Sequence, residues 1–399
     1  MTTNPTAAAT TAANCNLFST SSSSSNAVCP LPSSASNTLT LYPCYGFTVG
    51  SSCNTSSSNG ALNAVQVVLK QPLNTTFANF VTAIWGSNVN TVTVTTTAIA
   101  ELLPGGQTCL LALGSGNPPT GNTLSASTSA TLNMPNCSLA SLSTSGNSIQ
   151  LSGPGNLTIN AAAVITAGNI LGSPPPNTRT YLPLQDPYKS VAASFSAPAP
   201  PSSCVPWTGG TAIPPGTYCG ITISSGNVTF IGGTYNIVGP PGISINGSPT
   251  VTFGPGLYYI YGGSFSIKGL TGGSVTGTGI TIVLTKSGGG PADGIDIEAN
   301  VCSANISLSG TKTGQGLLQP SPTASQGLLF FQDPTAVTSN PNIISGCATP
   351  NVTLNGAIYT PATMGQLQGN FLANVKGCTE LISQSFTFSG NLEVARALR

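Results

Sequence analysis

A short apolar pattern that recurs through the second half of the chain constrains the fold most strongly. A turn rich in Gly and Pro, a tyrosine and alternating apolar residues appear three times, at 215–223, 233–237 and 255–260. Each copy leads into a further short strand bounded by glycine. A spacing of roughly 20 residues between strand-turn-strand units is typical of the turns of a parallel β-helix. We therefore predict a mainly β chain whose main part, residues 205–395, is a right-handed parallel β-helix.

Two further segments fit this interpretation. Residues 105–172 contain short apolar alternations separated by Gly, Asn or Ser, and we expect them to form the first rungs of the helix. Residues 173–204 contain the run Pro174-Pro175-Pro176 and are expected to form a polyproline-like strap that interrupts the rungs. A β-sandwich or β-barrel is the alternative, because short alternating strands also build those folds.

The front of the chain differs in composition. Residues 1–37 are mostly Ala, Thr, Ser and Asn, and we expect a flexible tail. Residues 38–104 are expected to form a small α+β module. Its strands are predicted over 39–49, 61–70 and 89–99, and apolar residues at helical spacing predict a helix over 76–85.

Charged side chains are scarce enough to exclude several kinds of function. The 399 residues include nine Lys or Arg, eight Asp or Glu and no histidine. Acid, base and metal chemistry therefore lacks most of its usual groups, and we predict neither an enzyme nor a cofactor nor a metal site. Without a basic patch, nucleic acid is not expected as a partner.

Eleven cysteines, with no close CxxC spacing, favour disulfides in an oxidising compartment over a zinc site. Proximity suggests three pairs, Cys44 with Cys53, Cys109 with Cys137, and Cys204 with Cys219. A fourth bridge would join two of Cys302, Cys347 and Cys378, with Cys347 and Cys378 as the candidate pair. Cys15 could join Cys29, and the odd count leaves one thiol unassigned.

One acidic cluster could carry chemistry. Asp296 and Glu298 alternate on one predicted strand, and Asp293 lies in the preceding turn. Carboxylates on a β-helix face could serve sugar cleavage or a calcium site, so a carbohydrate-binding or carbohydrate-cleaving protein is the alternative function. A solvated strand is the favoured interpretation, because no Lys or Arg lies closer in sequence than Lys286.

Two other patterns could bind ligands. Tyr258, Tyr259, Tyr261 and Phe265 could stack on sugars, although alternation along a rung should bury about half of them. Residues 91–97 resemble the threonine ladder of an ice-binding solenoid. That function would need a flat Thr array across many rungs, which the sequence does not reveal.

The chain contains no apolar stretch of the roughly 18 to 20 residues that a membrane helix needs, and no export signal precedes the cysteines. Disulfides form in oxidising compartments outside the cytoplasm, and a protein needs an export signal to reach them. We therefore expect that Met1 stands where a longer native N-terminus has been removed.

Two regions resemble the TadE/TadG-like family of Flp (tight-adherence) pilus-assembly proteins. The first includes Tyr45-Gly46-Phe47, residues 64–69, 77–80 and 92–100, Thr108-Cys109-Leu110-Leu111-Ala112-Leu113 and Asn136-Cys137-Ser138-Leu139. The second includes residues 327–334, 354–361 and 377–382. The resemblance covers about residues 39–170 and 325–390, and the shared order of the motifs carries it.

The resemblance implies a bacterial envelope protein with a pilin-like module at 38–104, anchored in the inner membrane by an N-terminal helix and otherwise lying outside the cytoplasm. That helix is absent from this sequence, so either it has been removed or the chain is a soluble relative with another role. It further implies a role in assembling an adhesive pilus, with other pilus or envelope proteins as partners. The expectation from the sequence is thus a non-enzymatic, extracytoplasmic structural or adhesion protein whose neutral surface binds another subunit or a glycan.

Overall fold

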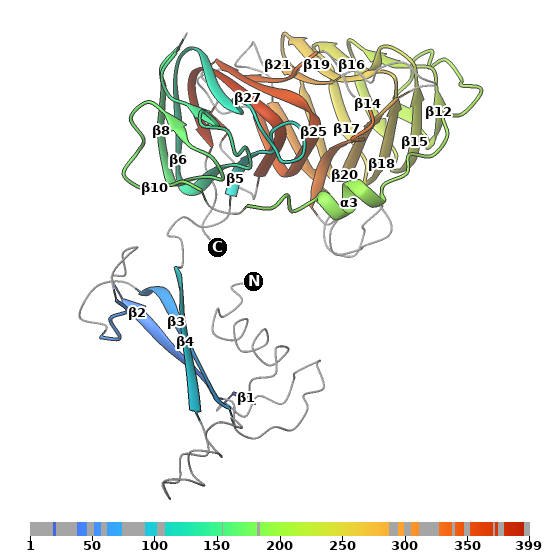
Figure 1. Cartoon of the computed structure of the whole chain (residues 1–399). Coiled ribbons are helices and arrows are strands. Elements are labelled where there is room, and N and C mark those ends of the chain that lie inside the picture. The colour runs from blue at the N-terminus through green and yellow to red at the C-terminus, as the bar shows by residue number, and fades with distance from the viewer. Residues whose placement is uncertain are drawn as a thin grey trace, which may run out of the picture. The chain divides into compact units, whose positions relative to one another are not determined.

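The computed structural model is mainly β and divides into two compact units, Met1–Pro104 and Gly105–Arg399 (Figure 1). It describes residues 19–20, 38–45, 52–56, 62–73, 92–101, 108–153, 155–181, 184–286, 294–298, 305–310, 327–336, 340–346, 352–369, 372–373 and 379–394.

The first unit contains a small sheet. Strands β2 (Thr38–Tyr45), β3 (Leu62–Leu73) and β4 (Val92–Glu101) are antiparallel neighbours, and β1 (Ser19–Thr20) pairs with β2 in parallel. These strands overlap the three predicted from the sequence. The helix expected over 76–85 and most of the tail lie outside the described residues.

The second unit contains a sheet of 23 strands, and the pairings between its strands are parallel. Its first strands are β5 (Thr108–Ala112), β6 (Leu124–Ser141), β7 (Ile149–Gln150), β8 (Leu157–Thr166), β9 (Ile170–Leu171) and β10 (Thr178–Arg179). After the single described helix, α3 (Lys189–Ser194), follow β11 (Ala212–Ile213), β12 (Gly216–Tyr218), β13 (Ile221–Ile223), β14 (Asn227–Phe230), β15 (Gly233–Val238), β16 (Gly242–Gly247), β17 (Thr250–Phe253), β18 (Gly256–Tyr261), β19 (Ser264–Leu270) and β20 (Ser274–Thr285). The last are β21 (Ile295–Glu298), β22 (Asn305–Gly310), β23 (Leu328–Gln332), β24 (Asn342–Gly346), β25 (Val352–Gly369), β26 (Leu372–Ala373) and β27 (Thr379–Val394).

Pairing follows a regular rule through the middle of this unit. Each strand lies beside the third strand after it, as β12 lies beside β15 and β15 beside β18. Like residues are therefore stacked: Tyr235 lies opposite Tyr258, and Val228 lies opposite Val251. The recurring apolar pattern in the sequence corresponds to this repeated register.

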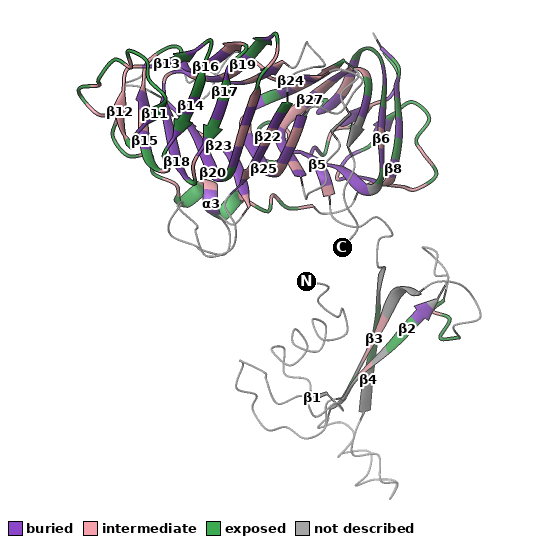
Figure 2. Ribbon diagram, turned by 180° about the vertical axis from the view of Figure 1, so that it is seen from behind, coloured by how far each residue is buried: buried purple, intermediate pink, exposed green. Residues whose placement is uncertain are grey.

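The core lies between the strands, where one side of each strand is buried. Along β14 and β17 buried and exposed residues alternate (Figure 2). Aromatic rings continue the stacking inside: Phe230 lies on Phe253 with ring centroids 4.6 Å apart, and Tyr235 lies on Tyr258 at 4.7 Å. Such contacts add to the hydrophobic gain from burying the rings.

The position of residues 105–172 differs from the sequence prediction. They do not precede the main set of strands but pair with its last strand, because Leu381 of β27 lies opposite Leu110 of β5 and Phe386 lies opposite Leu124 of β6. The other edge of β27 pairs with β25. β27 therefore joins the two groups of strands. One of its edges pairs with β25 and the other with β5 and β6, so the backbone groups of both edges are hydrogen-bonded.

The Pro-rich segment consequently has to return across the unit. Its first part contains β10, which pairs with β8 at one end of the unit, so this part extends the strands instead of interrupting them as expected. The segment then leads to β11 and β12 at the other end. On the way, α3 packs Val191 into a second apolar cluster on the outer side of the strands, with Leu257, Val283, Phe331, Tyr359 and Ile382 among its members. The strap thus covers an apolar face that would otherwise be exposed.

Candidate functional site

The acidic cluster forms an ion-paired group across two strands. Lys268 of β19 lies opposite Glu298 of β21, and Ser266 lies opposite Asp296. The Lys268 ammonium contacts an Asp296 oxygen and lies 3.1 Å from Glu298 Oε1. Distance in sequence did not reveal this cation, because Lys268 is farther from the carboxylates along the chain than Lys286 but is adjacent to them in the sheet. Asp293 lies outside the described residues.

The electrostatics of this cluster follow from the lysine and from burial. Desolvation raises the pKa of Asp296, while the hydrogen bond and charge of Lys268 oppose that rise. Hydrogen bonding to Asp296 raises the pKa of Lys268 in turn. A carboxylate pair held by a lysine is an ion-pair network, and no cluster of three potential metal ligands occurs among the described residues.

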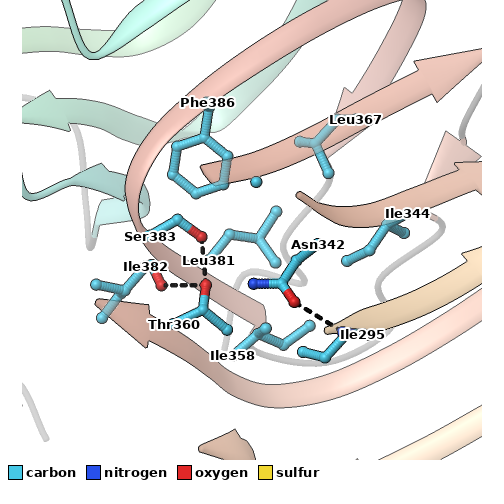
Figure 3. Close-up of a pocket in the computed structure, with 11 residues that line it drawn as sticks. Ile295, Asn342, Ile344, Ile358, Thr360, Leu367, Leu381, Ile382, Ser383 and Phe386 are labelled. Atoms are coloured by element: carbon cyan, nitrogen blue, oxygen red, sulfur yellow. Dashed lines mark hydrogen bonds between the residues drawn. The ribbon is translucent and has the colours of Figure 1, made fainter. Parts of the chain in front are cut away.

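A cavity inside the strands gives no room for a substrate. It measures about 10 Å³ and is lined by residues of β21, β24, β25 and β27 (Figure 3). Asn342 Oδ1 accepts a hydrogen bond of 2.7 Å from the amide of Ile295, and the hydroxyls of Thr360 and Ser383 lie 2.5 Å apart. The Asn342 amide nitrogen is buried without a partner. A space of this size holds one water molecule at most.

Three disulfides are present among the described residues. They join Cys44 to Cys53, Cys109 to Cys137 and Cys204 to Cys219, the pairs suggested by proximity in the sequence. Cys347 and Cys378, together with Cys302, Cys15 and Cys29, lie outside the described residues.

The aromatic residues considered for sugar binding are buried. Tyr258, Tyr261 and Phe265 expose at most 1% of their surface, and Tyr259 exposes 8%. Tyr258 donates a hydrogen bond of 2.6 Å to the carbonyl of Gly254, which satisfies its hydroxyl inside the fold. None of the four is available to stack on a sugar.

The covered apolar face includes a half-buried acidic contact. Tyr359 of β25 donates a hydrogen bond of 2.8 Å to Asp186 Oδ2 in the strap, and Asp186 Oδ1 accepts one of 2.9 Å from the Tyr188 amide. The Tyr188 and Tyr359 rings lie 5.4 Å apart. Burial raises the pKa of Asp186, although these bonds and the charge of Lys189 oppose the rise. The contact holds the strap in place.

A second outer face, by contrast, is polar, and its side chains are exposed or half-exposed. The side chains at one register position of β14, β17, β20, β22 and β25 are Thr229, Thr252, Thr276, Ser307 and Thr353. Two residues earlier on β14, β17, β20 and β22, the side chains are Asn227, Thr250, Ser274 and Asn305. All nine are exposed or half-exposed. We call these nine residues the hydroxyl array.

The hydroxyl array was not recognised in the sequence, where a flat Thr array across many rungs was not seen. Its members come from five strands that are separated in the chain by turns and by other strands. A repeated Asn-Val-Thr or Thr-Val-Thr triplet at 227–229 and 250–252 is the signal that could have found it.

No helix in the described part of the chain is long and apolar enough to cross a membrane. No protein-family model, curated protein or solved structure matches the chain. Conclusions about function therefore depend on the geometry of this chain and on the motifs in its sequence.

Proposed function

We propose that the chain is a non-enzymatic, extracytoplasmic structural or adhesion component of a bacterial envelope, and that its second unit coils as a right-handed parallel β-helix. The observation that carries this proposal is the repeated parallel register, in which Tyr235, Tyr258 and Ile282 lie side by side in successive strands. Each layer buries apolar side chains against the next, and such a stack forms a stiff rod.

Other features support the same proposal. The three disulfides suit an oxidising compartment. The resemblance to TadE/TadG-like proteins supports a place in a Flp-type pilus or its assembly machinery, with other pilus or envelope proteins as partners. An inner-membrane anchor in a longer form of the protein belongs to the same proposal.

The carbohydrate-cleaving alternative has weaker support. Its candidate residues, Asp296 and Glu298, share Lys268 as a common partner. A general acid needs a carboxyl whose proton can reach the substrate, and this arrangement uses both carboxylates in ion pairing.

One experiment separates the two functions. In a bacterium that encodes the chain, deleting the gene should reduce adhesion to surfaces. A variant carrying Asp293→Asn, Asp296→Asn and Glu298→Gln should restore adhesion fully, because no catalysis is lost. If the triple variant folds but fails to restore adhesion, and the unaltered protein degrades a polysaccharide, the carbohydrate-cleaving alternative replaces the proposal.

A further inference from the structure

The hydroxyl array has an unusual chemical uniformity. On the β14, β17 and β22 strands and on residues 274–278 and 352–355, the side chains that point outward are Thr, Ser and Asn throughout. None is charged and none is aromatic. A nucleic acid or an anionic surface would need positive charge, and a protein partner would ordinarily need aromatic or Arg anchors. The array offers neither.

The backbone fixes the positions of these side chains. Adjacent strands of a sheet lie about 4.8 Å apart, and alternate residues along a strand lie about 6.6 Å apart. Because the register of Thr229, Thr252 and Thr276 is continuous, their side chains repeat at these two intervals. The array is therefore a two-dimensional lattice of polar groups.

Threonine suits such a lattice. Its branched β-carbon restricts χ1, so hydroxyl and methyl groups stay in place with little loss of side-chain entropy when they bind. The hydroxyls of Thr229, Thr252 and Thr276 have no hydrogen-bond partner within the described part of the protein. They are free to bond to ordered water, which is nearly as favourable as a direct contact.

We propose that the hydroxyl array binds ice. Ice is uncharged, needs no groove, and presents oxygen atoms at short repeats in two directions over a whole plane. Threonine hydroxyls and asparagine amides extend that hydrogen-bond network, while the threonine methyl groups exclude disordered water between them. A polysaccharide fits less well, because aromatic rings that would stack on sugars are absent from this face. The inference depends only on the paired strands and not on the proposed role in a pilus.

The test uses the full chain with its disulfides formed. We expect it to partition into slowly growing ice and to inhibit ice recrystallisation. Thr252→Tyr, at the centre of the array, should reduce both effects about tenfold, because a bulky ring holds the neighbouring columns away from the ice surface. Thr222→Tyr is the matched control, since Thr222 is exposed on β13 and belongs to another face. It should behave like the unaltered protein.

Circular dichroism and thermal melting should show that both variants remain folded. Exclusion of the unaltered protein from ice would overturn the inference, and so would equal losses in the two variants. Binding to crystalline cellulose without binding to ice would also overturn it and would assign the array to a polysaccharide. In each of these cases the adhesion test of the proposed function stays independent, because it changes other residues.

Discussion

At the scale of single residues, neighbours across strands decide the chemistry more than neighbours in sequence. Lys268 and Asp296 are separated in sequence by the whole of strand β20, yet they form an ion pair because β19 and β21 are adjacent. The carboxylates themselves could be identified from the sequence as a cluster on one strand. Their cation could not, because the register between strands is fixed only when the layers pack.

Asp186 allows a prediction about pH. Burial raises the pKa of its carboxyl in the folded state above the ordinary value of 3.8. Between pH 3.8 and the raised pKa of the folded state, the Asp186 carboxyl of the folded chain holds a proton that the same carboxyl has lost in the unfolded chain. The carboxyl therefore favours folding below pH 3.8, and this contribution is lost as the pH rises through the folded pKa.

We expect Asp186→Asn to remove this dependence while keeping a hydrogen-bonding side chain near Tyr359. The stability of the unaltered protein relative to the variant should fall as the pH rises above 3.8, by at most about 1.4 kcal/mol per pH unit, the limit for one proton. Urea unfolding of both proteins at several pH values measures this difference in the free energy of unfolding. A constant difference across the range would contradict the assignment.

At the scale of elements, local patterns in the sequence predict the strands and the strap, because alternation, glycine and proline act over a few residues. The same patterns do not predict where β5 and β6 lie. Their partner, β27, is at the other end of the chain, and both edges of β27 must be paired. The sequence carries no local signal for such a pairing.

The strap should depend on the burial of α3. Val191 exposes 6% of its surface within the outer apolar cluster, whereas Ala193 on the same helix is exposed. Val191→Asp places an unpaired charge in that cluster, which costs roughly 3 kcal/mol unless the helix detaches. We expect a protease to cleave within 173–204 faster in this variant.

Ala193→Asp is the matched control, since it adds the same charge to the same helix on its exposed side. Cleavage of the strap at equal rates in the two variants would show that burial of Val191 does not hold it. Mass spectrometry of the fragments locates the cut in each case.

At the scale of the whole molecule, the order of strands in space is a rearrangement of their order in sequence. Asn391 and Leu392 of β27 lie opposite Thr131 and Leu132, and Leu381 lies opposite Leu110. In the preceding layer, residues 352–355 of β25 lead directly into residues 357–360. A chain continued from Val394 along the same path would arrive at Thr108. The strap is needed because the second unit starts with β5, so that the chain has to return from β10 to β11.

This geometry predicts that a circular permutant folds. Joining residue 399 to residue 105 and opening the chain between Pro200 and Pro201 gives a polypeptide in which β5 and β6 follow β27, the strand with which they pair. The compact division at Pro104 makes the unpermuted fragment 105–399 the matched control. We expect the two to melt within a few degrees of each other and to give the same far-ultraviolet circular dichroism, because termini in an exposed segment are well tolerated. The permutant loses only the covalent continuity of the strap, whose longer part, residues 173–200, still docks through Val191 and Phe195. If instead it aggregates while the fragment folds, then β5 and β6 do not extend the stack from β27, and the strand order described for this unit fails with them.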